Sequence, residues 1–278
     1  MFRFPLKDVT IIVTQQRQII TYPLYSDEWQ QINQHQFSLD VEGVAFYYAC
    51  NGNYIEVCPY ENYNQNELEL YLNGSVYGAI LHQRLVLPLH GSCFKYKGMG
   101  IMLCGDSGAG KSSVTASFSL NGAAFLTDDV SPLLFRTGKP QIWAMSDRIK
   151  LWSDSLEQLT QVKNGLHQID PETEKFYFPM NSDKGKIVPL HQIFLLGIHD
   201  EPEVKFREVI GIEKFTALRN EIYRWEYLEG MPECEKEYFE KITCICKEVR
   251  VAKVLRPKEI GIEQFCEYVE KYIYSLEI

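Results

Sequence analysis

The stretch Gly105-Asp106-Ser107-Gly108-Ala109-Gly110-Lys111-Ser112 decides how the rest of the chain is interpreted. It matches the Walker A pattern G-x-x-x-x-G-K-[ST] and lies between a short apolar run at 100–104 and a segment with helical spacing. Glycines at these positions let backbone N–H groups close around a phosphate, and the following helix points its positive N-terminal end at the same phosphate. The stretch therefore predicts a nucleotide phosphate site, although a glycine-rich turn that only caps a helix has a similar composition.

The side chains of this loop have definite expected roles. The Lys111 ammonium can reach the β- and γ-phosphate oxygens, and the Ser112 hydroxyl can ligate Mg²⁺. We expect ATP to contact residues 105–112 and the adjacent Ser113, and we count Lys111 among the catalytic residues.

An acidic pair follows the segment after this loop. Residues 123–127 form a compact apolar run that predicts a strand, and it leads directly into Asp128 and Asp129. Beside a phosphate loop, one carboxylate can assist Mg²⁺ and the other can accept the proton of an attacking hydroxyl. Turns also use aspartate widely, so the pair gains its meaning from the loop upstream. The residues alone leave open which carboxylate takes which role.

Composition bounds the class of protein. The chain has 278 residues, a hydrophobic content of 45% and a net charge of −9, with an estimated pI of 5.3. This is an ordinary globular composition, and the negative charge disfavours nucleic acid or an anionic membrane as a partner. The alternation of β and α segments along the chain predicts an α/β protein. The eight cysteines show no paired C-x-x-C spacing, which favours thiols in a reducing compartment over zinc ligands. No apolar run approaches the length of a membrane span, so we expect a cytoplasmic protein.

The order of apolar patterns suggests two regions. Residues 1–75 are rich in β patterns, including a hairpin at 44–57 and a further short strand at 68–72. From residue 74 the spacing becomes helical. We therefore divide the chain into a β-rich N-terminal region, 1–75, and a nucleotide-binding catalytic domain, 76–278. The segments expected in the second region are a hairpin at 93–104, a helix from 111 to 121, strands at 123–127, 193–196 and 249–255, a strand pair at 141–151, and helices at 213–229, 233–248 and 262–276.

Basic side chains outside the loop are weaker candidates. Arg148 and Lys150 alternate with apolar Ile149 and Leu151, so both should emerge on one face of a strand. That face could meet the nucleotide or remain solvated, and we include Arg148 among the expected nucleotide contacts. The roles of Lys150, Lys184 and Lys186 stay open, although a lysine-bearing loop at 183–186 could close over phosphates.

These motifs together resemble a known family. His90-Gly91, the loop at 105–112 and Thr127-Asp128-Asp129 are similar in type and spacing to the catalytic domain of HPr kinase/phosphorylase. The resemblance implies a P-loop kinase of the HPr kinase and phosphoenolpyruvate carboxykinase type, with a mixed sheet and flanking helices. It also implies Asp128 as catalytic base, Asp129 near Mg²⁺ and His90 as a catalytic histidine beside them.

The chain departs from this family at two places. Ser113 stands where HPr kinases usually carry a glutamate, and no E-[ILV]-R-G-[ILV]-G stretch follows residue 130. The chain is more similar to the stand-alone HPr-kinase-like proteins of bacterial clusters for ribosomally made peptides, which include lasso-peptide kinases that act on a precursor serine.

The expected function is therefore ATP-dependent phosphorylation of a serine hydroxyl, with ATP and Mg²⁺ as cofactors and a precursor peptide as acceptor. Two alternatives remain open at this stage. One is a kinase for free serine or another small hydroxyl metabolite, and the other is a nucleotide-binding module of a peptide-maturation complex without transfer activity. Association into a homo-oligomer is also left open by the sequence.

Overall fold

The computed structural model describes residues 2–159, 165–169 and 173–275 and divides into two compact units. The first contains Met1–Pro88 with Ile222–Thr243, and the second contains Leu89–Glu221 with Cys244–Ile278. This division differs from the expected boundary at residue 75, because the next helix and a segment from late in the chain belong to the first unit. The buried His82 imidazole joins those two segments, with its Nδ1 3.0 Å from the Tyr238 hydroxyl.

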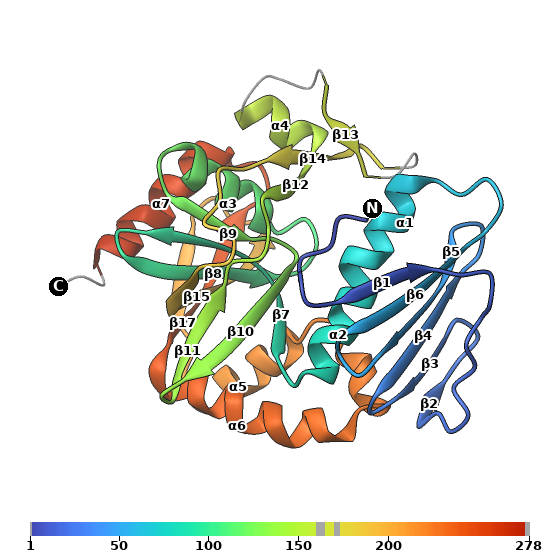
Figure 1. Cartoon of the computed structure of the whole chain (residues 1–278). Helices are drawn as coiled ribbons and strands as arrows, with labels where there is room; N and C mark the ends of the chain where they lie inside the picture. The colour runs from blue at the N-terminus through green and yellow to red at the C-terminus, as the bar shows by residue number, and fades with distance from the viewer. Residues whose placement is uncertain (1, 160–164, 170–172, 276–278) are drawn as a thin grey trace. The chain divides into compact units, whose positions relative to one another are not determined.

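The first unit contains a six-stranded sheet with the order β1-β6-β5-β4-β3-β2 (Figure 1). Only β1 and β6 are parallel, and the other neighbours are antiparallel. The expected hairpin is confirmed as β5 and β6, with Ala45 opposite Pro59 and Cys50 opposite Tyr54. The strands are β1 (Thr10–Val13), β2 (Tyr25–Ser26), β3 (Gln30–Asn33), β4 (Gln36–Val41), β5 (Ala45–Cys50) and β6 (Tyr54–Pro59).

The strand expected at 68–72 is wrong, because this segment is helical. It belongs to α1 (Gln65–Tyr71), which continues through the π-helical turn η1 (Leu72–Val76) into α2 (Tyr77–Gln83). Asn64 starts α1 by accepting a hydrogen bond from the Asn66 N–H. Leu68, Leu72 and Val76 are fully buried at intervals of four residues, which is the helical period. The alternating Leu-Glu-Leu-Tyr-Leu sequence also matches a strand, so the pattern alone was ambiguous.

The second unit contains an eight-stranded mixed sheet with the path β11-β10-β7-β8-β15-β17-β16, in which β9 pairs with β7. Because β11 also pairs with β15, the strands β11, β10, β7, β8 and β15 form a closed circuit of pairings. The expected hairpin at 93–104 is confirmed as β7 and β8. The strands are β7 (Leu87–Tyr96), β8 (Met99–Gly105), β9 (Ala124–Thr127), β10 (Val130–Arg136), β11 (Lys139–Trp143), β15 (Ile187–His199), β16 (Lys205–Glu208) and β17 (Arg250–Pro257).

Two helices cover one face of this sheet. They are α3 (Lys111–Leu120) and α7 (Ile262–Ser275), both close to the expected ranges. Their apolar stripes form one core with β7, β8, β15 and β17, in which the Phe94 and Phe118 rings stack with centroids 4.6 Å apart. The apolar stripe of α7 was readable at the helical period, which is why its position could be predicted.

The strand pair expected at 141–151 is wrong as a pair, because both strands form but lie in different sheets. β11 belongs to the large sheet, whereas β12 (Arg148–Trp152) pairs with β14 (Lys175–Pro179) in a three-stranded sheet with the order β12-β14-β13. The third strand is β13 (His167–Gln168), and α4 (Ser153–Leu159) follows β12. Ile149 and Leu151 of β12 are buried against α3 and α4, which holds this small sheet to the body of the unit.

The long helix expected at 213–229 is also broken. α5 (Gly211–Asn220) ends before Glu221, and the 3₁₀ helix η2 (Trp225–Glu229) begins after Arg224, whose φ is +53°. Between them the Tyr223 N–H donates to the Pro88 carbonyl, so this backbone bonds to another segment rather than to a helix turn. The next helix, α6 (Pro232–Glu248), is confirmed. No helix within the described residues is long and apolar enough to cross a membrane.

Gly105→Ala is expected to destabilise the second unit strongly. Gly105 has a φ of +121°, and an added Cβ would lie 2.2 Å from the Leu196 carbonyl oxygen on the neighbouring strand. The left-handed conformation alone costs about 1–3 kcal/mol, and the backbone overlap adds to it. Gly138→Ala is the matched control, because its φ is +71° and its Cβ would meet no atom within 4 Å. Urea unfolding should show a much larger loss of stability for Gly105→Ala, and equal losses would contradict the close strand approach.

Candidate functional site

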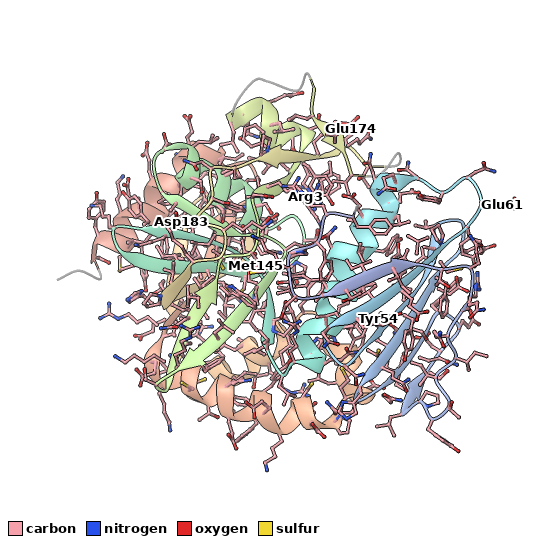
Figure 2. The ribbon with its side chains drawn as sticks, viewed as in Figure 1. Arg3, Tyr54, Glu61, Met145, Glu174 and Asp183 are labelled. Atoms are coloured by element: carbon pink, nitrogen blue, oxygen red, sulfur yellow. The ribbon has the colours of Figure 1, made fainter. Side chains whose placement is uncertain are left out.

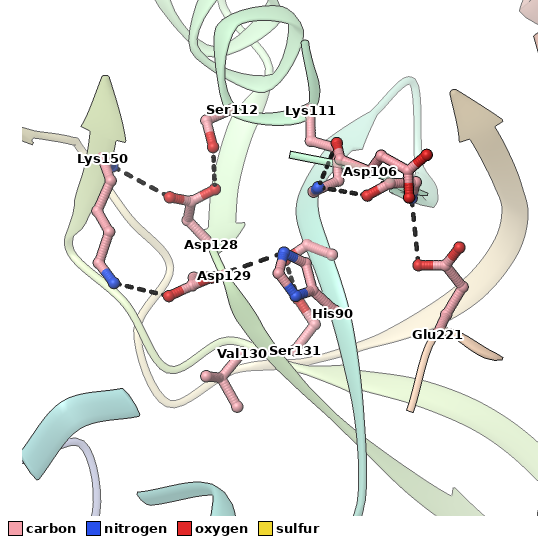
Figure 3. A network of polar contacts seen from close by, with 12 residues as sticks. His90, Asp106, Lys111, Ser112, Asp128, Asp129, Val130, Ser131, Lys150 and Glu221 are labelled. Atoms are coloured by element: carbon pink, nitrogen blue, oxygen red, sulfur yellow. Dashed lines mark hydrogen bonds and ion pairs between the residues drawn. The ribbon is translucent and has the colours of Figure 1, made fainter. Parts of the chain in front are cut away.

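Strand direction brings the predicted residues to one edge of the large sheet. β8 and β9 both run antiparallel to β7, so their carboxyl ends lie level with the beginning of β7. The phosphate loop leaves β8 after Gly105, the acidic pair follows β9, and His90 lies near the start of β7. Figure 3 shows His90, Lys111, Asp128 and Asp129 converging at this edge. Ligand sites at the carboxyl ends of strands are typical of α/β proteins.

The phosphate loop has the expected strand–loop–helix geometry. Lys111 begins α3 and follows Gly110, whose φ is +107°. The Lys111 ammonium is buried and donates to the Gly105 carbonyl at 2.5 Å and the Asp106 carbonyl at 3.1 Å (Figure 3). The lysine thus lies across the loop, on the carbonyls that it would leave to bind a phosphate.

Two residues that the sequence did not predict hold this loop in place. The Glu221 carboxylate accepts a hydrogen bond of 3.2 Å from the Gly105 N–H. Arg256, near the end of β17, donates to the Ala109 carbonyl at 2.9 Å and the Gly108 carbonyl at 3.1 Å. Burial raises the pKa of Glu221, and the Gly105 N–H opposes this rise. Both residues lie more than a hundred positions from the loop in sequence, so no local sequence pattern could predict their contact with it.

Asp128 is the first member of the acidic pair and contacts the loop helix directly. Its carboxylate accepts hydrogen bonds from the Ser112 hydroxyl at 2.8 Å and from the Lys150 backbone N–H at 3.0 Å (Figure 3). Burial, and then the neighbouring charge of Asp129, raise its pKa above the usual value, although these hydrogen bonds oppose the rise. A carboxylate with a raised pKa is a better proton acceptor than an ordinary surface aspartate.

Asp129 has the opposite electrostatic setting. Burial would raise its pKa, but the Lys150 ammonium at 2.6 Å and His90, with Nε2 at 3.8 Å, outweigh burial and hold the pKa well below its usual range. Its φ is +70°, and the Val130 N–H bonds to the Asp128 carbonyl at 2.9 Å, so the residue occupies the centre of a γ-turn. Such backbone strain concentrates at functional sites. The Asp129 carboxylate is therefore held in its ionised form, whereas the Asp128 carboxylate beside it has a raised pKa.

His90 completes the group. Burial, opposed by Asp129, lowers the pKa of its imidazole below the usual value. Its backbone N–H donates to the Glu221 carbonyl at 2.7 Å, which ties β7 to the residue that holds the phosphate loop. The lowered pKa favours the neutral form of the imidazole beside Asp129.

A cavity of about 800 Å³ opens over these residues. Most of the predicted site lines it: His90, Ser107, Gly108, Gly110, Lys111, Ser112, Ser113, Asp128 and Asp129. Other cations line it as well, namely Lys150, Lys175, Arg256 and Lys258. Glu174, labelled in Figure 2, lines it just before β14. Substrate-sized clefts with a few convergent charged groups are the usual form of a catalytic pocket.

Some predicted residues lie outside the lining of this cavity. Gly105, Asp106 and Ala109 form the back of the loop. The Arg148 guanidinium lies 3.7 Å from the centre of the Tyr177 ring on the same face as Lys150, but away from the cavity. Of the two loop lysines, Lys184 pairs with Asp147 at 3.4 Å and Lys186 with Asp183 at 2.7 Å. The alternation of Arg148 and Lys150 thus predicted the correct face but only one cavity residue.

The oxygen donors suit Mg²⁺ in combination with phosphates. Within the described part of the chain, no group of three or more His, Cys, Asp or Glu side chains forms a metal site by itself. Mg²⁺ usually takes one or two carboxylates together with phosphate oxygens and water. A site in which the protein supplies only part of the ligands is therefore compatible with Mg²⁺. Ser112 hydrogen bonds to Asp128 rather than to Asp129, its predicted metal partner.

Lys150→Met is expected to move the acid limb of the pH–activity profile to higher pH. The Lys150 ammonium favours the ionised form of Asp129, and its loss removes a positive charge from a coupled carboxylate pair. The pair should then keep its proton to a higher pH, by on the order of one pH unit. Lys184→Met, outside the cavity, should leave the limb in place. An unchanged limb in Lys150→Met would mean that the pair does not control it.

Comparison with known proteins gives little. No protein-family model matches the chain. No curated protein matches it either. One matching solved structure is the HPr(Ser) kinase/phosphatase from Coxiella burnetii, with 12% identity, 69% of this chain and 99% of that chain covered, and a TM-score of 0.36. At this TM-score the likeness carries no argument about the activity of this chain.

Proposed function

We propose that this protein is an ATP-dependent kinase that transfers the γ-phosphoryl group to a serine hydroxyl, with a serine of a ribosomally made precursor peptide as its acceptor. The observation that carries the proposal is the direct contact of the loop with the acidic pair, in which Ser112 hydrogen bonds to Asp128 at 2.8 Å. A phosphate site and a carboxylate of raised pKa then share one cavity. The peptide as acceptor is supported only by the motif resemblance described above.

The residues suggest a division of labour. The loop N–H groups and Lys111 bind the β- and γ-phosphates, and Arg256 and Glu221 keep the loop in shape. Ser112 and Asp129 would supply oxygen ligands for Mg²⁺, which would neutralise phosphate charge. Asp128 accepts the proton of the serine hydroxyl. At the same time the serine oxygen forms a bond to the γ-phosphorus, and the bond from that phosphorus to the bridging oxygen of ADP breaks.

Asp129 and its neighbours act through charge. The Lys150 ion pair at 2.6 Å keeps Asp129 ionised, and the negative Asp129 helps to raise the pKa of Asp128. Separating the pKa values of two adjacent carboxylates is a known way to give them different roles. His90 lies beside this pair, with Nε2 3.8 Å from Asp129, and its lowered pKa favours the neutral imidazole there.

The test is transfer of label from γ-labelled ATP to a panel of acceptors: serine-containing peptides, HPr, free serine, and a reaction without acceptor. Label on a peptide supports the proposal, and label on free serine alone replaces the peptide with a metabolite. ATP binding without transfer to any acceptor would contradict a kinase and favour a nucleotide-binding module. Binding should be measured in parallel, so that a misfolded sample is recognised.

A further inference from the structure

The small sheet presents one face of mixed cationic and aromatic character. In the antiparallel pairing of β12 with β14, Lys150 lies opposite Tyr177 and Trp152 lies opposite Lys175. Opposed residues and their second neighbours share a face, so Arg148 also belongs to it. The other face, with Ile149, Leu151, Phe176 and Phe178, packs into an apolar core.

The end of this face that carries Lys150, Trp152 and Lys175 lines the cavity. Lys150 is already engaged by Asp129 at 2.6 Å. The Lys175 ammonium lies 5.3 Å from the centre of the Trp152 ring, and none of the carboxylates that the structure describes forms an ion pair with it. The cavity therefore holds a partly buried cation that has no carboxylate at ion-pair distance among the described residues.

Lys175 lines the same cavity as the acidic pair. Burial is the largest effect on the pKa of Lys175 and lowers it. The charge of Lys150 and, more weakly, that of Lys111 also lower this pKa, whereas Asp129 and Asp128 raise it. The phosphate loop has its own lysine and its own N–H groups. Lys175 is thus a further cation of the cavity, carried by a different sheet from the loop.

We propose that Lys175 binds a carboxylate of the acceptor, so that the enzyme selects acidic hydroxyl substrates. This inference rests on the kinase function proposed above and specifies its substrate class. An anion held at Lys175 fixes the acceptor at one end and directs the neighbouring hydroxyl toward Asp128, and such positioning contributes to both affinity and rate. The Trp152 ring beside Lys175 gives the acceptor an apolar surface on which to lie. The carboxylate can come from two sources, serine itself or an acidic residue next to serine in a peptide.

The first test compares charged and neutral acceptors. Serine is paired with serinamide, and a peptide with glutamate beside serine is paired with its glutamine counterpart. The wild type should prefer the carboxylate member of at least one pair by on the order of tenfold in kcat/KM. The pair in which this preference occurs shows whether the carboxylate belongs to serine itself or to a neighbouring acidic residue. Lys175→Met should reduce this preference to less than about twofold by raising KM for the charged acceptor.

Lys184→Met is the matched control, because it removes a partly exposed lysine that pairs with Asp147 outside the cavity. It should keep the wild-type preference. If Lys175→Met slows the charged and neutral acceptors equally, Lys175 acts on the transferred phosphoryl group and the proposal is overturned. Transfer without any preference in the wild type overturns it as well, while leaving the kinase function intact.

A second test does not depend on turnover. Calorimetry in the presence of ADP compares O-phosphoserine with O-phosphoethanolamine, which lacks the carboxylate. The wild type should bind O-phosphoserine at least about fivefold more tightly, and Lys175→Met should bind the two alike. Equal affinities in the wild type, or no binding of either compound, would overturn the carboxylate site. Absence of transfer to every acceptor in the first test, by contrast, would contradict the kinase function itself.

Discussion

Asp128→Asn is expected to reduce phosphoryl transfer by about 10²–10⁴-fold, the usual contribution of a general base. Asparagine has nearly the same shape. Its single amide oxygen can still accept from the Lys150 N–H, and its NH2 group can donate to the Ser112 hydroxyl oxygen, so the loop and the small sheet should stay in place. What it loses is the ability to take the proton of the attacking hydroxyl. Nucleotide affinity should therefore remain close to that of the wild type.

The measurement is single-turnover transfer from ATP, with ATP affinity determined both with and without Mg²⁺. Loss of transfer with unchanged affinity in both conditions identifies Asp128 as the base. Loss of affinity in the presence of Mg²⁺ alone would instead make Asp128 a metal ligand, an outcome that its contact with Ser112 makes worth testing. Asp129→Asn is the companion variant, since the metal role was predicted for Asp129. An active Asp128→Asn would refute the assignment.

Lys111→Met should remove both nucleotide affinity and transfer. The Lys111 ammonium is buried at the start of α3 and spans the loop from the Gly105 carbonyl to the Asp106 carbonyl. Lys111 is the single lysine of the loop at 105–112, and the other cations of the cavity come from other segments, so we expect none of them to replace its charge on the phosphates. Loss of such a group costs on the order of 10²–10³-fold in rate in comparable electrostatic sites.

Equilibrium ATP binding and the transfer rate should both be measured for Lys111→Met. Thermal unfolding without ligand serves as its control, because methionine fills a similar volume and removes hydrogen bonds only to loop carbonyls. Lys258→Met is the matched variant, since Lys258 lines the same cavity from outside the loop. An equal effect of both variants would show that the cavity needs positive charge in general and that Lys111 has no special position.

The parts of the site that could be predicted are those whose residues are contiguous in the sequence. The loop at 105–112 and the pair Asp128-Asp129 are each short motifs, and the alternation at 148–151 predicted the face of β12. Glu221, Lys175 and Arg256 could not be found in this way. Their positions depend on the end of α5, the pairing of β12 with β14 and the parallel pairing of β15 with β17, which are set by tertiary packing.

The fold shows the same limit at the level of whole elements. The amphipathic stripe of α7 and the hairpin of β5 and β6 have one consistent period each, and both were predicted. The segment at 68–72 fits two periods, and burial on one helical face decided between them. The break after α5 depends on a backbone hydrogen bond from Tyr223 to the distant Pro88, which leaves no trace in local sequence.

One residue of the small sheet contacts both carboxylates of the acidic pair. The backbone of Lys150 bonds to Asp128 and its side chain bonds to Asp129, so the two contacts form or break together with the docking of β12 (Figure 3). Under the proposed kinase function, a chain whose loop has folded but whose small sheet has not docked would have a nucleotide site without a positioned base. Docking of β12 would then decide when transfer can begin.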